Sequence, residues 1–226
     1  MRRTRMIFTL LFLTALPLEV HADMVWHSAY QNPMSNWSAY MYDQNVKRHL
    51  RERAAKPAGP SSSAATTSTT TPASPRAPIS ATDFPRDPNG KDVVVQFIAA
   101  TNLSPADSTK LATALRSTMA QLGSAGRKDN VATAMTLLLG LSYGVLEKPG
   151  FDPNRADDLI PAVNDTLAAS PQFKSLGAAD RQNMYDSMLL SAAVIAMVHQ
   201  SGDKVSSKTI AKQTLQQILG PSGAEF

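Results

Sequence analysis

The sequence predicts an all-α protein, with a compact orthogonal or bundle-like domain of about five to seven helices. Two observations from residue 82 onward predict this class. Apolar side chains recur at intervals of three or four residues, and Ser-Pro, Asp-Pro and Gly-Pro pairs divide the chain into segments of helical length. The sequence contains no cysteine, which excludes disulfides and thiolate zinc sites. Residues 82–226 must therefore rely on an apolar core, and a domain of that size can bury roughly two-thirds of its unfolded surface.

Residues 1–22 have the composition of a secretory signal peptide. Three arginines precede an apolar run, and Val20 and Ala22 place small side chains at the two positions that a signal peptidase reads. The run is shorter than the ~20 residues of a membrane-spanning helix, so a retained anchor is the less favoured alternative. We expect the mature protein to begin near Asp23 and to be exported by the general secretion route to the periplasm or the exterior.

Residues 23–56 form an arm that is rich in aromatic and basic side chains. Both tryptophans of the chain and three of its five tyrosines lie within seventeen residues of this arm: Trp26, Tyr30, Trp37, Tyr40 and Tyr42. Aromatic side chains of this kind anchor contacts with a partner protein, a glycan or a membrane interface. The alternative is that the arm folds back and its aromatic side chains complete the core of the helical domain.

Residues 57–81 are a linker of proline, serine, threonine and alanine, in which Ile79 is the only large apolar residue. Such a segment buries too little apolar surface to offset the entropy of ordering it. We interpret it as a disordered, extended tether between the arm and the helical domain of residues 82–226.

The first two helices are predicted at residues 93–98 and 105–122. The β-branched run 93–98 is compatible with a strand, but a single strand has no partner here, so a helix is favoured. Ser104 and Pro105 start the second helix as an N-cap and an N1 proline, and Gly123 ends it. Its apolar side contains Leu111, Leu115, Met119 and Leu122.

The next helix is expected to begin after Asp129, as its N-cap, and to stop at Pro149. Its broad apolar face contains Val131, Met135, Leu138, Leu139, Ser142, Val145 and Leu146. Gly140 and Gly144 lie four residues apart within it, a spacing that favours the close approach of a crossing helix, with a dimer contact as the alternative.

Two shorter segments follow, and proline marks the start of each. Asp152 and Pro153 are expected to cap a helix that Pro161 either kinks or begins. Ser170 and Pro171 start a short turn that ends at Gly177.

Residues 178–200 are predicted to form the central helix, because apolar side chains surround it after the first two turns. The last helix is expected at residues 207–219, with Ala211, Leu215, Ile218 and Leu219 directed inward. Gly220 and Pro221 end it.

The charge of the chain argues against nucleic-acid binding. The net charge is +4, but the signal peptide carries three arginines and one glutamate, and its removal leaves +2. Residues 82–226 hold 13 basic and 14 acidic side chains. A nearly neutral domain lacks the excess of Lys and Arg with which proteins neutralise phosphates.

Groups of side chains with the spacing of a catalytic or metal-binding site are scarce. His27, His49 and His199 are far apart, none at the one-turn spacing that metal ligation favours, so we expect no metal and no cofactor. His199 suits the C-terminus of the central helix as a cation. Acidic residues lie mainly at helix starts, where they accept backbone hydrogen bonds: Asp107, Asp129, Asp152 and Asp180.

One polar cluster is a candidate site. Asp180, Arg181, Tyr185 and Asp186 lie in the first turns of the central helix and would line a polar pocket beside it. The alternative is a solvated helix face with internal ion pairs.

The order of segments and several short motifs resemble a family of uncharacterised exported bacterial proteins of unknown function. The motifs are residues 128–132 (Lys-Asp-Asn-Val-Ala) at the start of an apolar helix, residues 180–182 (Asp-Arg-Gln) before Tyr185, and residues 219–220 (Leu-Gly). The resemblance implies an all-helical domain in a bacterial envelope setting. It implies no activity and no functional residues.

Three functions are compatible with these observations. The leading hypothesis is an exported, non-enzymatic helical protein that binds a macromolecular partner in the bacterial envelope or outside the cell, with the arm as the contact. The second is an envelope hydrolase with Asp180, Tyr185 and Asp186 beside a cleft. The third is a carrier of apolar small ligands, in which methionines line an adaptable cavity: Met119, Met135, Met184, Met188 and Met197. The sequence does not predict the oligomeric state.

Overall fold

The computed structural model describes residues 76–101, 103–147 and 159–219. The expected signal peptide, the arm with Trp26, Tyr30, Trp37, Tyr40 and Tyr42, and most of the linker lie outside these residues, as does the expected cap at Asp152. The described residues form seven α-helices and one 3-10 helix, and their only β pairing is an isolated bridge between Asp83 and Asn130. The prediction of an all-α domain is confirmed.

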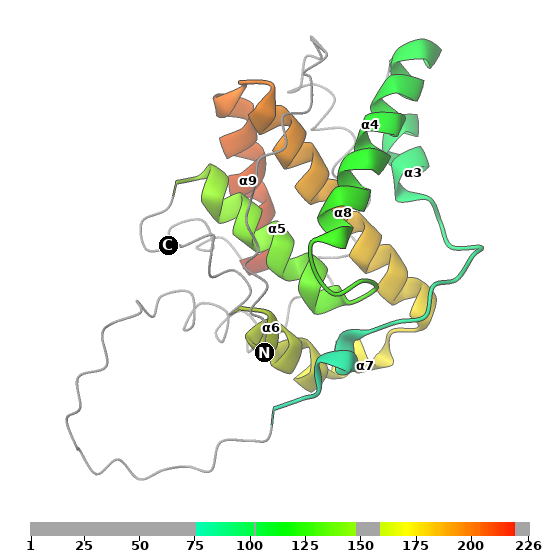
Figure 1. The fold of residues 1–226 in the computed structure, drawn as a ribbon, viewed down its shortest axis with the longest axis vertical. Coiled ribbons are helices and arrows are strands. Elements are labelled where there is room, and N and C mark those ends of the chain that lie inside the picture. Colours follow the sequence, from blue (N-terminus) through cyan, green and yellow to red (C-terminus); the bar gives the residue numbers. More distant parts are fainter. Residues whose placement is uncertain (1–75, 102, 148–158, 220–226) are drawn as a thin grey trace, which may run out of the picture.

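Helix α8 is central in the fold, and the other long helices pack around it (Figure 1). Its most extensive contacts are with α5, followed by α4 and α9, while α5 also contacts α6 and α9. The α-helices are α3 (Val93–Ala99), α4 (Pro105–Ser124), α5 (Val131–Val145), α6 (Ile160–Ala169), α7 (Pro171–Ser175), α8 (Ala178–Gln200) and α9 (Lys204–Leu219).

One apolar core joins these helices, and the predicted inward faces contribute to it. Its largest fully buried side chains come from α3, α4, α5, α6, α8 and α9 and include Leu115, Met135, Leu167, Ile195 and Leu215. No helix in the described ranges combines the length and the apolar character needed to cross a membrane.

Local capping explains several helix starts as predicted. The Ser104 hydroxyl accepts a hydrogen bond from the Asp107 N–H at 3.2 Å at the start of α4. The Ser170 hydroxyl accepts one from the Phe173 N–H at 3.3 Å at the start of α7. Pro161 lies in the first turn of α6 and does not kink it, because an N-terminal position has no intrahelical hydrogen bond to lose.

The β-branched run is the helix α3, as favoured. The carboxylate of Asp92 caps it by accepting hydrogen bonds from the backbone N–H groups of Val94 and Val95 at 2.9 and 3.1 Å. Val93, Val94 and Phe97 are buried in the core.

Two predicted helix starts are wrong. Asn130, and not Asp129, caps α5, and its side chain accepts the Thr133 N–H. Asp129 has a φ of 53° and binds Arg86 instead. Helix α9 begins at Lys204, one turn before the expected Ser207, because Asp203 accepts the Ser206 N–H at 2.9 Å and supplies a cap that the sequence interpretation overlooked.

The expected close approach of a crossing helix at the glycine pair of α5 is not found at Gly144. A Cβ atom built there meets no atom within 4 Å, so no described helix requires a glycine at this position. In contrast, a Cβ at Gly123 of α4 would lie 3.2 Å from the Tyr185 hydroxyl and 3.3 Å from Leu189 Cδ1 of α8. Close approach of helices occurs at Gly123.

Candidate functional site

The main polar feature of the structure is the contact between residues 76–91, which we call the strap, and the helices beneath it. The strap includes the 3-10 helix η1 (Ile79–Thr82). It runs from α6 past the N-terminal end of α8 and up to α3 (Figure 1). Its first residues belong to the expected linker, yet they make hydrogen bonds with α6.

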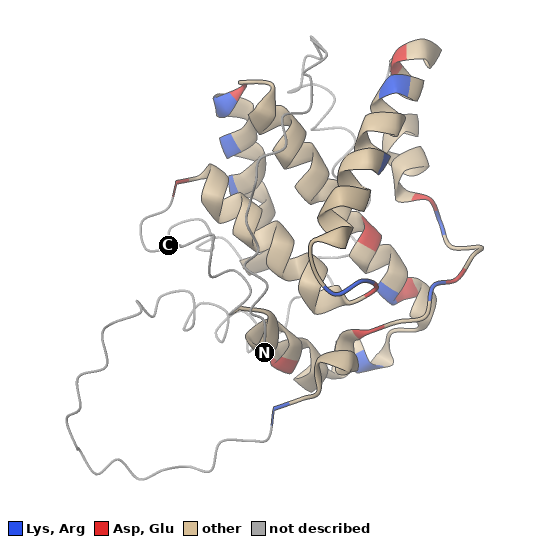
Figure 2. Cartoon of the chain, in the orientation of Figure 1, with Lys and Arg blue, Asp and Glu red and all other residues tan. Residues whose placement is uncertain are grey.

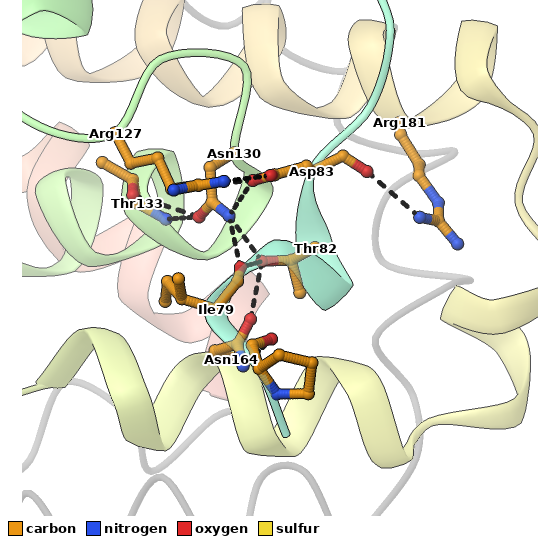
Figure 3. Close-up of polar contacts among 9 residues, drawn as sticks. Ile79, Thr82, Asp83, Arg127, Asn130, Thr133, Asn164 and Arg181 are labelled. Carbon is orange, nitrogen blue, oxygen red and sulfur yellow. Dashed lines mark hydrogen bonds and ion pairs between the residues drawn. The ribbon is translucent and has the colours of Figure 1, made fainter. Parts of the chain in front are cut away.

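Asn130 is the centre of the contact (Figure 3). Its side chain is fully buried, and its Nδ2 donates hydrogen bonds to three strap acceptors at 2.8 to 2.9 Å: the Ile79 carbonyl, the Thr82 hydroxyl and the Asp83 carboxylate. Its Oδ1 accepts the backbone N–H of Thr133 at 2.9 Å. A single amide therefore caps α5 and holds the strap, and its polar groups are satisfied despite burial.

Asn164 of α6 holds the other side of the strap. The Thr82 hydroxyl donates to Asn164 Oδ1 at 2.9 Å, and Asn164 Nδ2 donates to the carbonyls of Ala77 and Pro78 at 3.2 and 3.1 Å. The Ala77 N–H donates to the carboxylate of Asp165 at 2.9 Å. The strap residues 77–82 thus lie between two buried asparagines on different helices.

Asp83 forms an ion pair with Arg127 from the loop before α5. Arg127 Nε donates to Asp83 Oδ1 at 2.8 Å, and a second guanidinium nitrogen binds the other oxygen. The Arg127 hydrogen bond lowers the pKa of the Asp83 carboxyl below its ordinary value; burial opposes this effect, and Asn130 adds to it. Asp83 is therefore more acidic in the folded protein than in the unfolded chain.

Arg86 of the strap lies between two carboxylates from separate parts of the chain. Its Nε donates to Asp129 at 2.7 Å, and its two terminal nitrogens donate to the Asp186 oxygens at 3.2 and 2.9 Å. The guanidinium carbon is 5.4 Å from the Tyr185 ring centroid and 5.9 Å from that of Phe84. This combines a bidentate ion pair with cation–π contact.

Burial and charge shift the pKa values of Asp186 and Arg86 in opposite directions. Burial raises the pKa of Asp186, whose side chain is only 14% exposed, and the hydrogen bond from Arg86 opposes that rise. For Arg86, burial acts to lower the pKa, but the bonds to Asp186 and Asp129 raise it. Removing Arg86 would leave the Asp186 charge poorly solvated, whereas the Arg86 side chain is 40% exposed and would keep Asp129.

Two further residues of α8 bind the backbone of the strap. Arg181 donates to the Asp83 carbonyl at 3.3 Å, and its guanidinium lies 4.6 Å from the Phe173 ring centroid. Gln182 is buried, accepts the Asp87 N–H at 2.7 Å and donates to the Asp87 carbonyl at 3.3 Å. The first turns of α8 thus present a row of polar groups to the strap.

The predicted polar cluster is divided by this arrangement. Arg181, Tyr185 and Asp186 each contact the strap, and Tyr185 is buried edge-on against Phe84 with ring centroids 5.4 Å apart. Burial raises the pKa of Tyr185. Asp180 is exposed in the first turn of α8. Arg181 binds the Asp83 carbonyl and lies against the Phe173 ring, and the Asp186 carboxylate is occupied by Arg86.

The sequence interpretation missed Arg86, Asn130 and Asn164. A signal existed for Asn164, because it lies between Val163 and Leu167 on an apolar helix side, where a buried amide requires partners. Arg86 had no comparable signal, since its partner Asp186 is 100 residues away. Figure 2 shows the positions of charged residues along the strap and the adjacent end of α8.

The other predicted sites are distributed through the fold. In the described ranges, no group of three or more His, Asp or Glu side chains has the arrangement needed to hold a metal ion. His199 lies in the last turn of α8, with its Nδ1 3.3 Å from the Ser207 hydroxyl. Met135, Met184 and Met188 are buried in the core, and Met119 and Met197 pack against it.

Comparison with protein families decides the affiliation of the chain. The model of a family described as "Family of unknown function (DUF6683)" matches residues 1–222. The chain belongs to this family. The DUF6683 match covers the residues of the expected leader, arm and linker as well as the described helices. Comparisons with curated proteins and with solved structures gave no match, and the family supplies no activity.

Proposed function

We propose that this protein is an exported, non-enzymatic helical protein that binds a macromolecular partner in the bacterial envelope or outside the cell, and that residues 23–56 supply the contact. The observation that carries the proposal is the fixed strap. Asn130 and Asn164 hold strap residues 77–82 by buried hydrogen bonds. The chain that leads to the aromatic side chains therefore joins the described structure at a defined point beside α6.

The length of the intervening chain fits a contact made at a distance from the bundle. Nineteen residues, 57–75, separate the arm from the strap. A segment of that length spans at most about 65 Å when extended. The family match over residues 1–222 supports the arm and the helices as parts of one functional unit.

The polar cluster favours this proposal over a hydrolase. A catalytic carboxylate must reach the substrate, but the carboxylates of Asp186 and Asp129 bind Arg86. No specific contact favours an apolar-ligand carrier, because the methionines named for it are part of the packed core.

Affinity capture with matched variants tests the proposal. The full chain, its Trp26→Ala/Trp37→Ala variant and a Thr66→Ala/Thr67→Ala linker control would be exported, purified and incubated with envelope extracts, and the captured proteins would be identified. Each captured protein would then be purified and its affinity measured directly. We expect the tryptophan variant, but not the linker control, to lose at least tenfold in affinity, as aromatic anchors often carry most of the binding energy.

Two outcomes would contradict the proposal. Equal affinity of the tryptophan variant and the full chain would remove the arm from the contact. A large loss of helicity or of unfolding free energy in the tryptophan variant, measured by circular dichroism, would make the arm a part of the domain core.

A further inference from the structure

The outward face of α9 differs in charge from the rest of the described structure. Lys204, Lys208 and Lys212 follow one another at intervals of one turn, and α9 contains no acidic residue. Figure 2 shows these basic segments spaced along α9. The opposite side of the helix is buried in the core through Ile210, Leu215 and other apolar residues. The helix therefore has one apolar side and one side that is exclusively basic among its charges.

The position of the lysines does not favour the stability of α9. Lys204 is in the first turn, where the partial positive charge of the helix dipole repels a cation. Lysines four residues apart on one helix also repel each other. Cations would stabilise the helix more in its last turn, yet no basic residue occurs there. Sequence choices that oppose local stability are expected mainly where they serve a function.

Few acidic groups balance this face. Lys208 donates to the Glu147 carboxylate at 2.8 Å, and this contact lowers the pKa of Glu147, with smaller contributions from Lys204 and His199. The Asp203 carboxylate accepts the Ser206 N–H. Among the described residues, Lys204 and Lys212 have no ion-pair partner and remain available for another anion.

An apolar side chain lies within the same face. Val205 is 79% exposed, the highest exposure of the large hydrophobic residues described, compared with 55% for Val95 and 36% for Ile79. In sequence it follows Lys204 directly, and on the helix it lies near Lys208 and Lys212. The face thus combines positive charge with one protruding apolar group.

We propose that the outward face of α9 binds the surface of an anionic phospholipid bilayer, with Lys204, Lys208 and Lys212 near the lipid phosphates and Val205 in the interfacial layer. Basic side chains around an exposed apolar residue suit the boundary between headgroups and acyl chains. Lysine also acts as a point charge on a long apolar stem, which fits a fluid layer of phosphates better than a fixed carboxylate on a protein.

This inference is independent of the proposed role of the arm. The arm is connected to the helices through the strap beside α6, whereas the lysines belong to α9. The two surfaces can be tested separately, because substitutions on α9 leave residues 23–91 unchanged.

Vesicle partitioning tests the lipid proposal. The full chain would be mixed with vesicles of phosphatidylcholine containing increasing fractions of phosphatidylglycerol, and bound protein would be measured by co-sedimentation. The Lys204→Gln/Lys212→Gln variant keeps the Lys208–Glu147 pair. Lys91→Gln/Lys174→Gln is the matched control, because both of its lysines are exposed and lie outside α9. Circular dichroism would verify that both variants are folded.

A lysine near an anionic bilayer changes binding by about fivefold, so we expect the α9 variant to partition about twenty- to thirtyfold less than the full chain, and the control to partition normally. Higher salt should abolish the difference, because it screens the phosphates. Val205→Ser should weaken partitioning at high and low salt alike.

Three results would overturn the proposal. The first is equal partitioning of the α9 variant and the full chain, and the second is an equal loss in the control. For the third, binding of the full chain and the α9 variant to polyaspartate would be compared. If the α9 variant bound polyaspartate more weakly but vesicles as well as the full chain does, the lysines would be assigned to an acidic protein partner.

Discussion

Asn130 Nδ2 donates a 2.9 Å hydrogen bond to the Thr82 hydroxyl, and both side chains are fully buried although 48 residues separate them. The pair joins the strap to the first turn of α5. Since the Thr82 hydroxyl donates in turn to Asn164 of α6, three segments that are distant in sequence share one connected set of buried hydrogen bonds. The strap is therefore fixed to the folded domain by buried hydrogen bonds, although most of its residues are exposed.

Asn130→Ala should destabilise the protein strongly. The substitution removes a helix cap and leaves the buried Thr82 hydroxyl and Ile79 carbonyl without their amide donor, for a loss of about 3 kcal/mol in unfolding free energy. Urea unfolding followed by circular dichroism would measure it. Asn89→Ala, at an exposed strap position, is the matched control and should change stability by less than about 0.5 kcal/mol. Similar losses in both variants would refute the role given to Asn130.

The Arg86–Asp186 pair should show energetic coupling. Arg86→Met leaves a largely buried carboxylate unpaired, so we expect a loss of about 2 kcal/mol. Asp186→Asn should cost less, because Asp129 still binds Arg86 and burial disfavours the Asp186 charge. The double variant should lose less than the sum of the two, by about 1 kcal/mol in a double-mutant cycle. Strict additivity would mean that the two side chains do not stabilise each other.

Asp83 and Asp186 should have opposite effects on the pH dependence of stability. The pKa of Asp83 is lowered in the folded state. Its carboxylate therefore stabilises the fold at any pH above the unfolded pKa, and this stabilisation is lost as the pH falls through the lower folded pKa. The pKa of Asp186 is raised, so its ionisation reduces stability as the pH rises from the unfolded value through the folded one.

Unfolding free energies between about pH 2 and pH 7 would test these signs. In Asp83→Asn, the unfolding free energy should fall less steeply as the pH drops below the ordinary pKa of aspartate. In Asp186→Asn, the decrease in unfolding free energy that the full chain shows as the pH rises above that pKa should be absent. A variant whose pH profile runs parallel to that of the full chain would show that its carboxyl does not titrate differently on folding.

Gly144→Ala should stabilise the protein by about 1 kcal/mol, because alanine favours a helix and its Cβ meets no neighbour. The control is Gly123→Ala, also within a helix, where the new Cβ would crowd the Tyr185 hydroxyl and Leu189. Its gain should be smaller than that of Gly144→Ala. Thermal unfolding of the two variants side by side would measure the difference, and a loss of stability at Gly144 would place a close neighbour against α5.

Sequence patterns predicted the elements whose causes are local. The Ser104 and Ser170 caps and the apolar faces of α5 and α8 depend on residues within a few positions of one another. The sequence left two roles open for Pro161, a kink or the first turn, and the structure places it in the first turn. The choice between Asp129 and Asn130 as the cap of α5 was wrong because it depends on distant groups. Arg86 binds Asp129, and the Asp129 carbonyl accepts the Phe84 N–H at 3.1 Å, which leaves the cap position to Asn130.

The candidate site was only partly predictable for the same reason. The polar residues of α8 were identified as a group, but their partners are in the strap, about 100 residues earlier in the chain. The strap contains no helical periodicity, and its buried hydrogen bonds follow from its path across the bundle. Hydrophobic patterns do not encode such a path.

The anchoring of the strap also determines how tension would enter the protein. If the N-terminal segment were pulled while the bundle was held, the force would first reach the Ala77–Asp165 hydrogen bond and then the bonds of Asn164, Asn130 and Arg86. These contacts would break in that order as the strap peeled away. The chain that enters α3 would be pulled directly only after Arg86 had been released, so the strap would detach one contact at a time before α3 was loaded.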